Sequence, residues 1–357
     1  MSARERLIAE ASKRILLTDG AWGTQIQNFK LAEADYAGDL GLTHDQKGNN
    51  DILALTRPDV VESIARAYFD AGSDIISTNT FSSTRISQAD YGAEHLVRDL
   101  NLANAQLNRK VADEYTAKDG RPRFVAGAIG PTNKTLSLSP DVNDPGYREI
   151  DFDYLKDVYR DQVDALVEGG VDFILIETVF DTLNAKAAIM SVLEAQADLG
   201  RDIPIMISMT LTDLSGRNLS GHTVEAFWYA VKHARPVTIG LNCSFGAEQL
   251  RPHVKLLSGI AETLIMVYPN AGLPNELGEY DELPAETAAF VREWAAAGQV
   301  NILGGCCGSS PAHIAAMAKA IENSFLWVII LWCRILLLNE LALPWCRGRS
   351  TQYILHC

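Results

Sequence analysis

This sequence has little positive charge and few cysteines, and each scarcity excludes a class of protein. Its 31 lysines and arginines stand against 45 aspartates and glutamates, which gives a formal net charge of −14. An acidic chain is not attracted to phosphate backbones or anionic lipid, so we expect neither a nucleic-acid partner nor a membrane. Six cysteines in 357 residues are too few for a disulfide-built scaffold.

The chain also lacks a secretory signal and the composition of a disordered protein. Its first residues, MSARERLIAEASKR, are charged and contain no apolar stretch. With the sparse cysteines, this predicts a cytoplasmic, reducing environment. Hydrophobic residues make up 47% and charged residues 21%, so the chain can bury a large core. Its length suits one large α/β barrel or two ordinary domains.

The composition changes abruptly near residue 324. Residues 325–357 contain three of the six tryptophans and three of the six cysteines, but only four charged residues. Their apolar run, 325–338, is interrupted by Arg334 and is shorter than the roughly 20 residues that a spanning helix needs. We interpret 1–324 as the folded domain and 325–357 as an atypical apolar tail outside the fold. A frameshifted or misread end is favoured over a membrane tether.

Residues 1–324 alternate short aliphatic runs with longer helical patterns, which is typical of repeated βα units and a parallel sheet. Helices are expected at 58–71, 95–115, 154–168 and 285–297. Eight strands are expected at 15–18, 74–78, 124–129, 173–176, 205–209, 237–241, 264–267 and 301–303. Eight such units predict a (β/α)8 TIM barrel.

An open, doubly wound sheet is the alternative fold. Such a sheet usually carries a glycine-rich nucleotide fingerprint after its first strand. The corresponding segment here, DGAWGT (19–24), does not match GxGxxG. The barrel is therefore the favoured fold, as one domain.

Polar residues follow most of the predicted strands. In a barrel the carboxyl ends of the strands surround the active site. Cys243, Cys306 and Cys307, the three cysteines of residues 1–324, all stand at these ends. Three thiolates make a tetrahedral zinc site with one open position, as in catalytic zinc centres.

The adjacent pair Cys306 and Cys307 has other readings, a strained vicinal disulfide or unreactive core thiols. The glycines of GGCCG (304–308) give the backbone freedom to turn both sulfurs toward one point. Cys243, two strands away around the barrel, would supply the third ligand. The pattern as a whole favours a metal site.

Two carboxylates, Asp19 and Glu177, also follow predicted strands. They could bind a substrate ammonium group or act as general acid and base. Alternatively, Asp19 could cap the next helix and Glu177 could pair with a basic neighbour. Substrate binding is favoured, because an acidic residue that closes the apolar strand FILIE (173–177) is costly to bury without a partner.

At these motifs the chain resembles the homocysteine S-methyltransferase family, over roughly residues 10–323. GLNCS (240–244) and GGCCG (304–308) carry the resemblance, and DGAWGT is similar to the family's first-strand motif. Other stretches are similar to one branch, the N-terminal homocysteine-binding domain of cobalamin-dependent methionine synthases. They are GNNDIL (48–53), TNTF (78–81), SLSPDVNDPGYR (137–148), SGRNLSGHTVEAF (215–227) and YPNAGLPN (268–275).

The resemblance implies the barrel fold and a role for each matching residue. Cys243, Cys306 and Cys307 match the family's zinc ligands. One departure is Trp22, where the family commonly has methionine, beside the substrate loop.

The resemblance also implies how the substrate is held. Asp19 and Glu177 match the residues that hold the amino group of homocysteine. The backbone of Gly20 and the side chain of Thr78 lie where the family receives the substrate carboxylate.

The implied activity is zinc-dependent activation of the homocysteine thiol for methyl transfer, which gives methionine. A free thiol has a pKa of about 8.5 and is mostly protonated at neutral pH. Bound zinc lowers this pKa, so that the thiol is present as the nucleophilic thiolate. The implied methyl donor is methylcobalamin, presented by another domain, and nothing in residues 1–357 resembles a cobalamin-binding segment. Cobalamin-binding and folate-binding domains are therefore the implied partners. Two alternatives stay open: a stand-alone methyltransferase that uses betaine or S-methylmethionine, and an inactive, truncated zinc-binding barrel.

Overall fold

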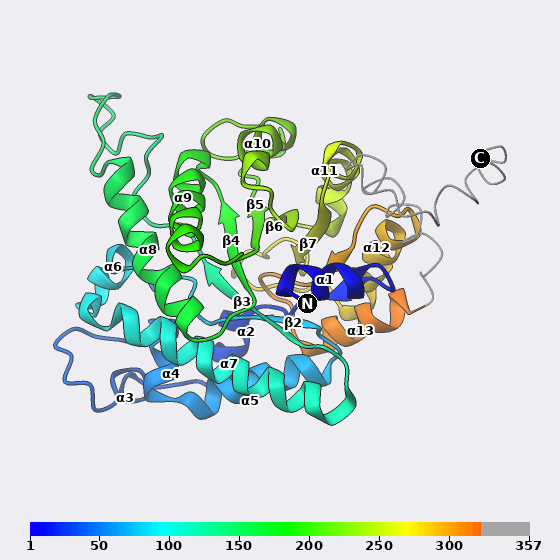
Figure 1. Ribbon diagram of the computed structural model, residues 1–357, viewed down its shortest axis with the longest axis horizontal. Helices are drawn as coiled ribbons and strands as arrows, with labels where there is room; N and C mark the ends of the chain where they lie inside the picture. Colours follow the sequence, from blue (N-terminus) through cyan, green and yellow to red (C-terminus); the bar gives the residue numbers. More distant parts are fainter. Residues whose placement is uncertain (323–357) are drawn as a thin grey trace.

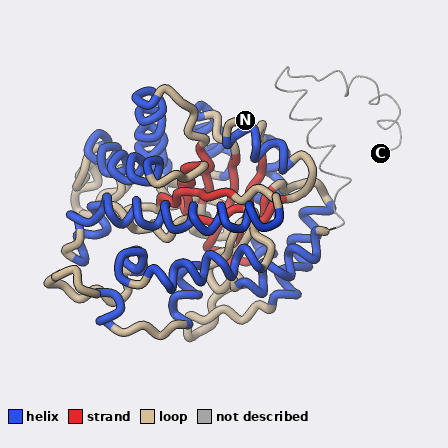
Figure 2. Tube along the Cα trace, turned by 60° about the horizontal axis from the view of Figure 1, so that its bottom comes forward, coloured by secondary structure: helices blue, strands red, loops and turns tan. Residues whose placement is uncertain are grey.

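The eight aliphatic runs form one eight-stranded parallel sheet in the computed structural model, which describes residues 1–322. Figure 2 shows the strands at the centre of the molecule with helices around them. The strands are β1 (Leu16–Leu17), β2 (Ile75–Ser77), β3 (Phe124–Ile129), β4 (Phe173–Val179), β5 (Ile205–Met209), β6 (Thr238–Gly246), β7 (Leu264–Asn270) and β8 (Ile302–Leu303). Each lies at a predicted position, so the (β/α)8 barrel is confirmed.

A helix follows each strand, and further short helices lie in the loops (Figure 1). The four helices expected from the sequence are present with slightly different ends. The helices are α1 (Ala3–Ala11), α2 (Trp22–Asn28), α3 (Glu33–Ala37), α4 (Leu53–Thr56), α5 (Pro58–Asp70), α6 (Arg85–Gln88), α7 (Val97–Asp119), α8 (Phe152–Glu168), α9 (Thr182–Leu199), α10 (Val224–Val231), α11 (Ala247–Ile260), α12 (Pro284–Ala296) and α13 (Pro311–Ile321).

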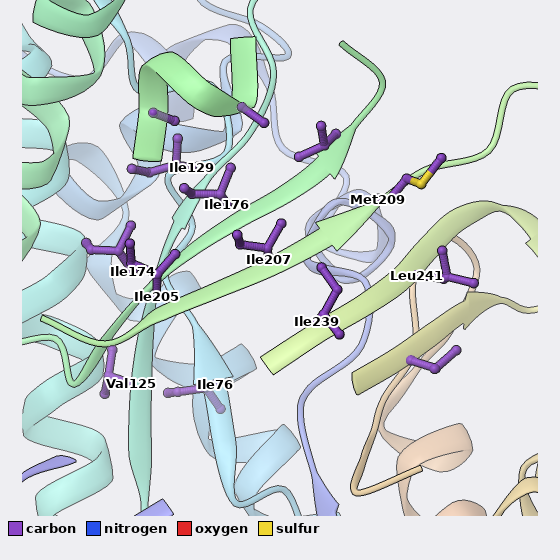
Figure 3. Packing of buried hydrophobic residues seen from close by; sticks show 14 of the residues in the cluster. Ile76, Val125, Ile129, Ile174, Ile176, Ile205, Ile207, Met209, Ile239 and Leu241 are labelled. Carbon is purple, nitrogen blue, oxygen red and sulfur yellow. The ribbon is translucent and has the colours of Figure 1, made fainter. Parts of the chain in front are cut away.

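Alternate strand residues pack into two separate layers of core, as the two-residue period of a strand requires. One set points outward against the helices and includes Ile174, Ile176, Ile205 and Ile207. Figure 3 shows this set across β2 to β6. The other set fills the barrel interior, where the rings of Phe124 and Phe173 are 5.5 Å apart.

Helix α1 closes the amino end of the barrel. Its Leu7 and Ala11 are fully buried and belong to the interior cluster. Ser2 caps the helix by accepting a hydrogen bond from the N–H of Glu5, whose carboxylate accepts in return from the N–H of Ser2. This reciprocal cap fixes the start of the helix. With the amino end covered in this way, the cavity lined by the candidate residues lies at the carboxyl ends of the strands.

Asp74 joins the two strands at the edges of the sheet, β1 and β2. Its backbone N–H donates to the carbonyl of Leu17 at 2.7 Å, and its carboxylate accepts from the N–H of Leu17 at 2.9 Å. The same carboxylate is fully buried and pairs with Arg14 at 2.6 Å and with Arg121. One side chain therefore replaces part of the strand pairing that would close the barrel.

The predicted boundary at 324 and the 325–357 tail lie outside the described residues. Within residues 1–322, no helix combines the length and the apolar character needed to cross a membrane.

We predict that Asp74→Ala lowers the free energy of unfolding by about 3 kcal/mol, because it leaves two arginines and a strand N–H without their shared acceptor. The matched control is Asp59→Ala, which removes a carboxylate that is 66% exposed and also pairs with an arginine, Arg57. Its effect should stay below about 1 kcal/mol. Urea unfolding followed by circular dichroism measures both. Equal losses would contradict the closing role of Asp74.

Candidate functional site

A cavity of about 540 Å³ opens at the carboxyl ends of the strands. Every candidate residue named from the sequence lines it, so the structure brings together positions spread over nearly three hundred residues. These are Asp19, Gly20, Thr78, Glu177, Cys243, Cys306 and Cys307. The structure therefore places these residues from the strand ends around one cavity, as the sequence predicted.

The sulfur atoms of Cys243, Cys306 and Cys307 all lie within 4.8 Å of one another. Those of Cys243 and Cys307 are 3.8 Å apart. A tetrahedral zinc ion with Zn–S bonds of about 2.3 Å needs sulfur atoms about 3.8 Å apart. The three thiols are present as free cysteines without a disulfide, and their spacing fits a shared metal ion.

Cys243 reaches the cluster because β6 bulges at its carboxyl end. The pairing of β6 with β7 shifts register between Asn242 and Gly246. The sequence predicted that the strand ends at residue 241, before Cys243, whereas in the structure Cys243 lies within β6. Cys243 and Ser244 have φ angles of 59° and 61°, a region that ordinary residues seldom occupy. Bulges of this kind redirect a side chain near a functional site.

Asn242 ties this bulge to β5 and, beyond it, to β4. Its side-chain oxygen accepts from the Ser208 hydroxyl at 2.6 Å and from the N–H of Thr178 at 3.1 Å. Its amide donates to the Thr178 hydroxyl at 2.8 Å. Thr178 itself has a φ of 56°, at a second register shift next to Glu177. The strained residues of β4 and β6 thus support each other.

The glycines of GGCCG act mostly by giving space. Of the three, only Gly308 has a positive φ, 78°. A Cβ on Gly305 would lie 2.2 Å from the Ser309 hydroxyl oxygen, so any side chain there would displace the loop. The expectation that conformational freedom orients both sulfurs therefore holds for Gly308, whereas Gly305 is required by close packing.

The thiols interact strongly with one another. Hydrogen bonds from Cys243 and Cys306 lower the pKa of Cys307 to about 3. The same contacts, with burial, raise the pKa of Cys306. The hydrogen bonds within the cluster therefore favour the thiolate form of Cys307, which is the form that binds a metal.

Asp19 is 5% exposed and accepts four hydrogen bonds. Three come to Oδ2, from the N–H and hydroxyl of Ser77 and from the indole of Trp22, and one comes to Oδ1 from Thr18. Burial raises the pKa of Asp19, and these hydrogen bonds oppose the increase. Asp19 does not cap α2, because the capping residue, Ala21, has no side-chain hydrogen bond.

Glu177 has far fewer partners. Its carboxyl accepts one hydrogen bond, from the Tyr268 hydroxyl at 3.2 Å, and forms no ion pair within residues 1–322. Burial, together with the charge of Asp19, raises the pKa of Glu177 to about 8. A partly buried carboxyl with so little compensation is suited to receive a cationic group.

Thr78 and Gly20 differ in what they can still bind. The Thr78 hydroxyl lies 2.6 Å from that of Thr80 and accepts from the N–H of Ala128, and Thr80 donates onward to the Ala128 carbonyl. Its proton is therefore directed to Thr80. The N–H of Gly20 has no hydrogen-bond partner among the described residues.

The described residues around the cavity include four carboxyl groups, those of Asp19, Asp51, Asp90 and Glu177, and no lysine, arginine or histidine. The cavity therefore has a negative rather than a positive potential, although burial raises the pKa of Asp19, Asp51 and Glu177, and it disfavours an anionic second substrate. Asp51 was not identified from the sequence as a site residue, although it lies in the quoted motif GNNDIL. It is 5% exposed, and burial raises its pKa to about 6.

Three asparagines on α7 hold the loops that surround the cavity. The side-chain amides of Asn101, Asn104 and Asn108 donate to the backbone carbonyls of Ser83, Asp51 and Ser77. All three are fully buried. Sequence analysis missed them, but their spacing of three and four residues places them on one helix face and was a usable signal.

A model of the homocysteine S-methyltransferase family matches residues 16–321. Two similar solved structures are forms of the homocysteine methyltransferase MmuM from Escherichia coli. The oxidized form is 22% identical, with a TM-score of 0.69 over 89% of this chain and 99% of that chain. The metallated form is 23% identical, with a TM-score of 0.67 over 86% and 96%. At this low sequence identity, the structural similarity shows a shared fold and nothing more specific.

We predict that Glu177→Gln stabilises the protein at high pH. The native pKa of about 8 exceeds the ordinary 4.5, so ionisation opposes folding increasingly as pH rises from about 4.5 to 8. The variant should match the parent near pH 5 and exceed it by about 2–4 kcal/mol at pH 9. Urea unfolding at both pH values, with Glu168→Gln at an exposed site as control, measures this. A gain that is the same at both pH values would contradict the argument.

Proposed function

This chain belongs to the homocysteine S-methyltransferase family, and we propose how its cavity performs the reaction. Cys243, Cys306 and Cys307 hold a zinc ion, and the cavity binds homocysteine with its thiol directed at that ion. Transfer of a methyl group to the sulfur then gives methionine. The observation that carries this proposal is the placement of three sulfur atoms within 4.8 Å of one another at the base of an acidic cavity.

The donor set supports zinc over harder metals, because thiolate ligands select zinc and similar soft ions. Bound there, zinc would lower the pKa of the substrate thiol and so supply a thiolate nucleophile at neutral pH. Three cysteine ligands leave one tetrahedral position for the substrate sulfur. The protein's own contribution is to fix the three sulfurs and to orient the rest of the substrate.

The amino group of homocysteine is proposed to lie between Asp19 and Glu177. Among the residues that the structure describes, Oδ1 of Asp19 accepts only the hydrogen bond from Thr18, and Glu177 accepts only that from Tyr268. Both carboxyl groups therefore have free acceptor positions. Because the pKa of Glu177 is about 8, an arriving ammonium group would favour the carboxylate and release its proton.

The substrate carboxylate requires hydrogen-bond donors in a cavity without basic side chains. The free N–H of Gly20 supports the role that the family resemblance gives to that residue. The Thr78 hydroxyl would have to turn from Thr80 to donate in the same way. Gly20 is therefore the better supported of the two.

The proposed methyl donor is methylcobalamin carried by a cobalamin-binding domain, on the strength of the branch-specific segments. The cavity, at about 540 Å³, is larger than homocysteine, so space remains beside the substrate for an incoming methyl group. The second candidate is a stand-alone enzyme that uses a small sulfonium or ammonium donor. Its support is the four carboxyl groups of the cavity and the absence of basic residues from its described lining.

We predict that replacing Cys243, Cys306 or Cys307 by alanine removes most of the bound zinc, because a site with two thiolates loses both charge and a ligand. Metal analysis of the purified variants measures this. Cys333→Ala, in the segment assigned to the tail, and Glu177→Gln, in the same cavity, are the controls, and both should retain zinc. Zinc X-ray absorption should show three sulfur neighbours at about 2.3 Å, and four after homocysteine is added. An unchanged zinc environment would mean that the metal is structural.

We predict that the full chain methylates homocysteine from free methylcobalamin faster than from betaine or S-methylmethionine. Methionine formation with each donor, at equal zinc content, measures this. A preference for either small donor would favour the stand-alone enzyme. Failure with all three donors, together with normal homocysteine binding, would favour an inactive zinc-binding barrel.

A further inference from the structure

The two oxygens of Asp19 have very different surroundings. Oδ2 accepts from the Ser77 N–H at 2.7 Å, the Ser77 hydroxyl at 2.8 Å and the Trp22 indole at 2.8 Å. Oδ1 accepts only from the Thr18 hydroxyl, at 3.0 Å. A carboxylate oxygen has about two lone-pair sites, so Oδ2 is saturated and Oδ1 is not. The free capacity of Asp19 is therefore confined to one oxygen.

Among these donors, Trp22 belongs to helix α2, whereas Ser77 is the last residue of β2 and Thr18 directly follows β1. Trp22 is the first residue of α2, and its indole N–H points back to Asp19 and to the Ser77 hydroxyl, 3.1 Å away. Its ring lies 6.4 Å from the ring of Tyr68, whose hydroxyl donates to the carbonyl of Ala21 at 3.0 Å. The indole is thus held from both sides, and it also lines the cavity.

We propose that Trp22 is a positioning residue for amino-group recognition: together with the two Ser77 donors, its N–H holds Oδ2 of Asp19 in place, so that Oδ1 is turned toward the substrate ammonium. This inference rests on the proposed function. Because the described lining contains no basic residue, the Asp19 carboxylate depends on neutral donors to remain charged and oriented. Removing one donor should weaken recognition of the ammonium group without disturbing the thiol end of the substrate.

Trp22→Phe separates this role from a purely structural one, because phenylalanine keeps an aromatic ring against Tyr68 and loses only the N–H. The comparison uses homocysteine and 4-mercaptobutyrate. The second compound has the same thiol and carboxylate as homocysteine but no amino group. Both are titrated calorimetrically into the full-length, zinc-loaded chain. Homocysteine affinity should fall roughly tenfold, as for loss of a hydrogen bond to a charged group, and mercaptobutyrate affinity should change less than about twofold.

Trp228→Phe is the matched control. Trp228 is 2% exposed, and its indole N–H has no hydrogen-bond partner among the described residues. Its replacement should leave both affinities unchanged. Ser77→Ala removes another donor from the same Asp19 oxygen and should reduce the preference for homocysteine in the same direction, which provides a second test if Trp22→Phe folds poorly.

The outcomes distinguish the inference from the function on which it rests. Equal weakening of both ligands by Trp22→Phe, or no change in either, would overturn the role of Trp22 alone. An unaltered chain that binds neither ligand, or that binds both equally well, would instead contradict the proposed homocysteine site. A selective loss for homocysteine, absent from Trp228→Phe, supports the inference.

Discussion

Closure of the barrel is the constraint on which the rest of the structure depends. Residues of the candidate site come from β1, β2, β4, β6 and β8, and they face one cavity only because the sheet curls until β1 and β2 meet. At that junction β1 contributes two residues and β2 contributes three, so little strand pairing is available. Asp74 supplies the missing contacts through its backbone and its buried, arginine-paired carboxylate. Opening this junction would separate Asp19 from Ser77, which are hydrogen-bonded across it.

The site concentrates unfavourable features that the surrounding structure must stabilise. Left-handed residues at Thr178, Cys243 and Ser244 lie at bulges of β4 and β6, the two strands that flank β5, and each such conformation costs roughly 1–3 kcal/mol. Four carboxyl groups share a cavity whose described lining has no positive side chain. Such strain and uncompensated charge are typical of sites where a ligand completes the electrostatic balance.

Rigidity around the cavity comes from neutral hydrogen bonds rather than from ion pairs. The α7 asparagines donate to the end of β2, to the loop that follows it and to the segment around Asp51, although their own side-chain oxygens find no partner among the described residues. Leaving such an acceptor buried costs about 1–3 kcal/mol. Amide contacts can hold the loops without adding a cation that would neutralise Asp19 or Glu177. The same logic applies to Trp22, which contacts Asp19 through a neutral N–H.

The sequence by itself determined the fold and grouped the cysteines and two carboxyl residues of the site, but it did not identify Asp51 or the α7 asparagines. Eight aliphatic runs separated by helical patterns specify a barrel, because strand and helix periods are local properties of the chain. In a parallel barrel all strands end at the same rim, so Cys243, Cys306, Cys307, Asp19 and Glu177 could be grouped from the sequence alone.

Only the tertiary structure decided the sulfur spacing, the bulge that places Cys243 inside β6, and the contrast between a saturated Asp19 oxygen and a nearly unpartnered Glu177. These depend on contacts between residues distant in sequence, such as Trp22 with Ser77 or Glu177 with Tyr268, and no local pattern encodes which of two oxygens a distant donor will reach.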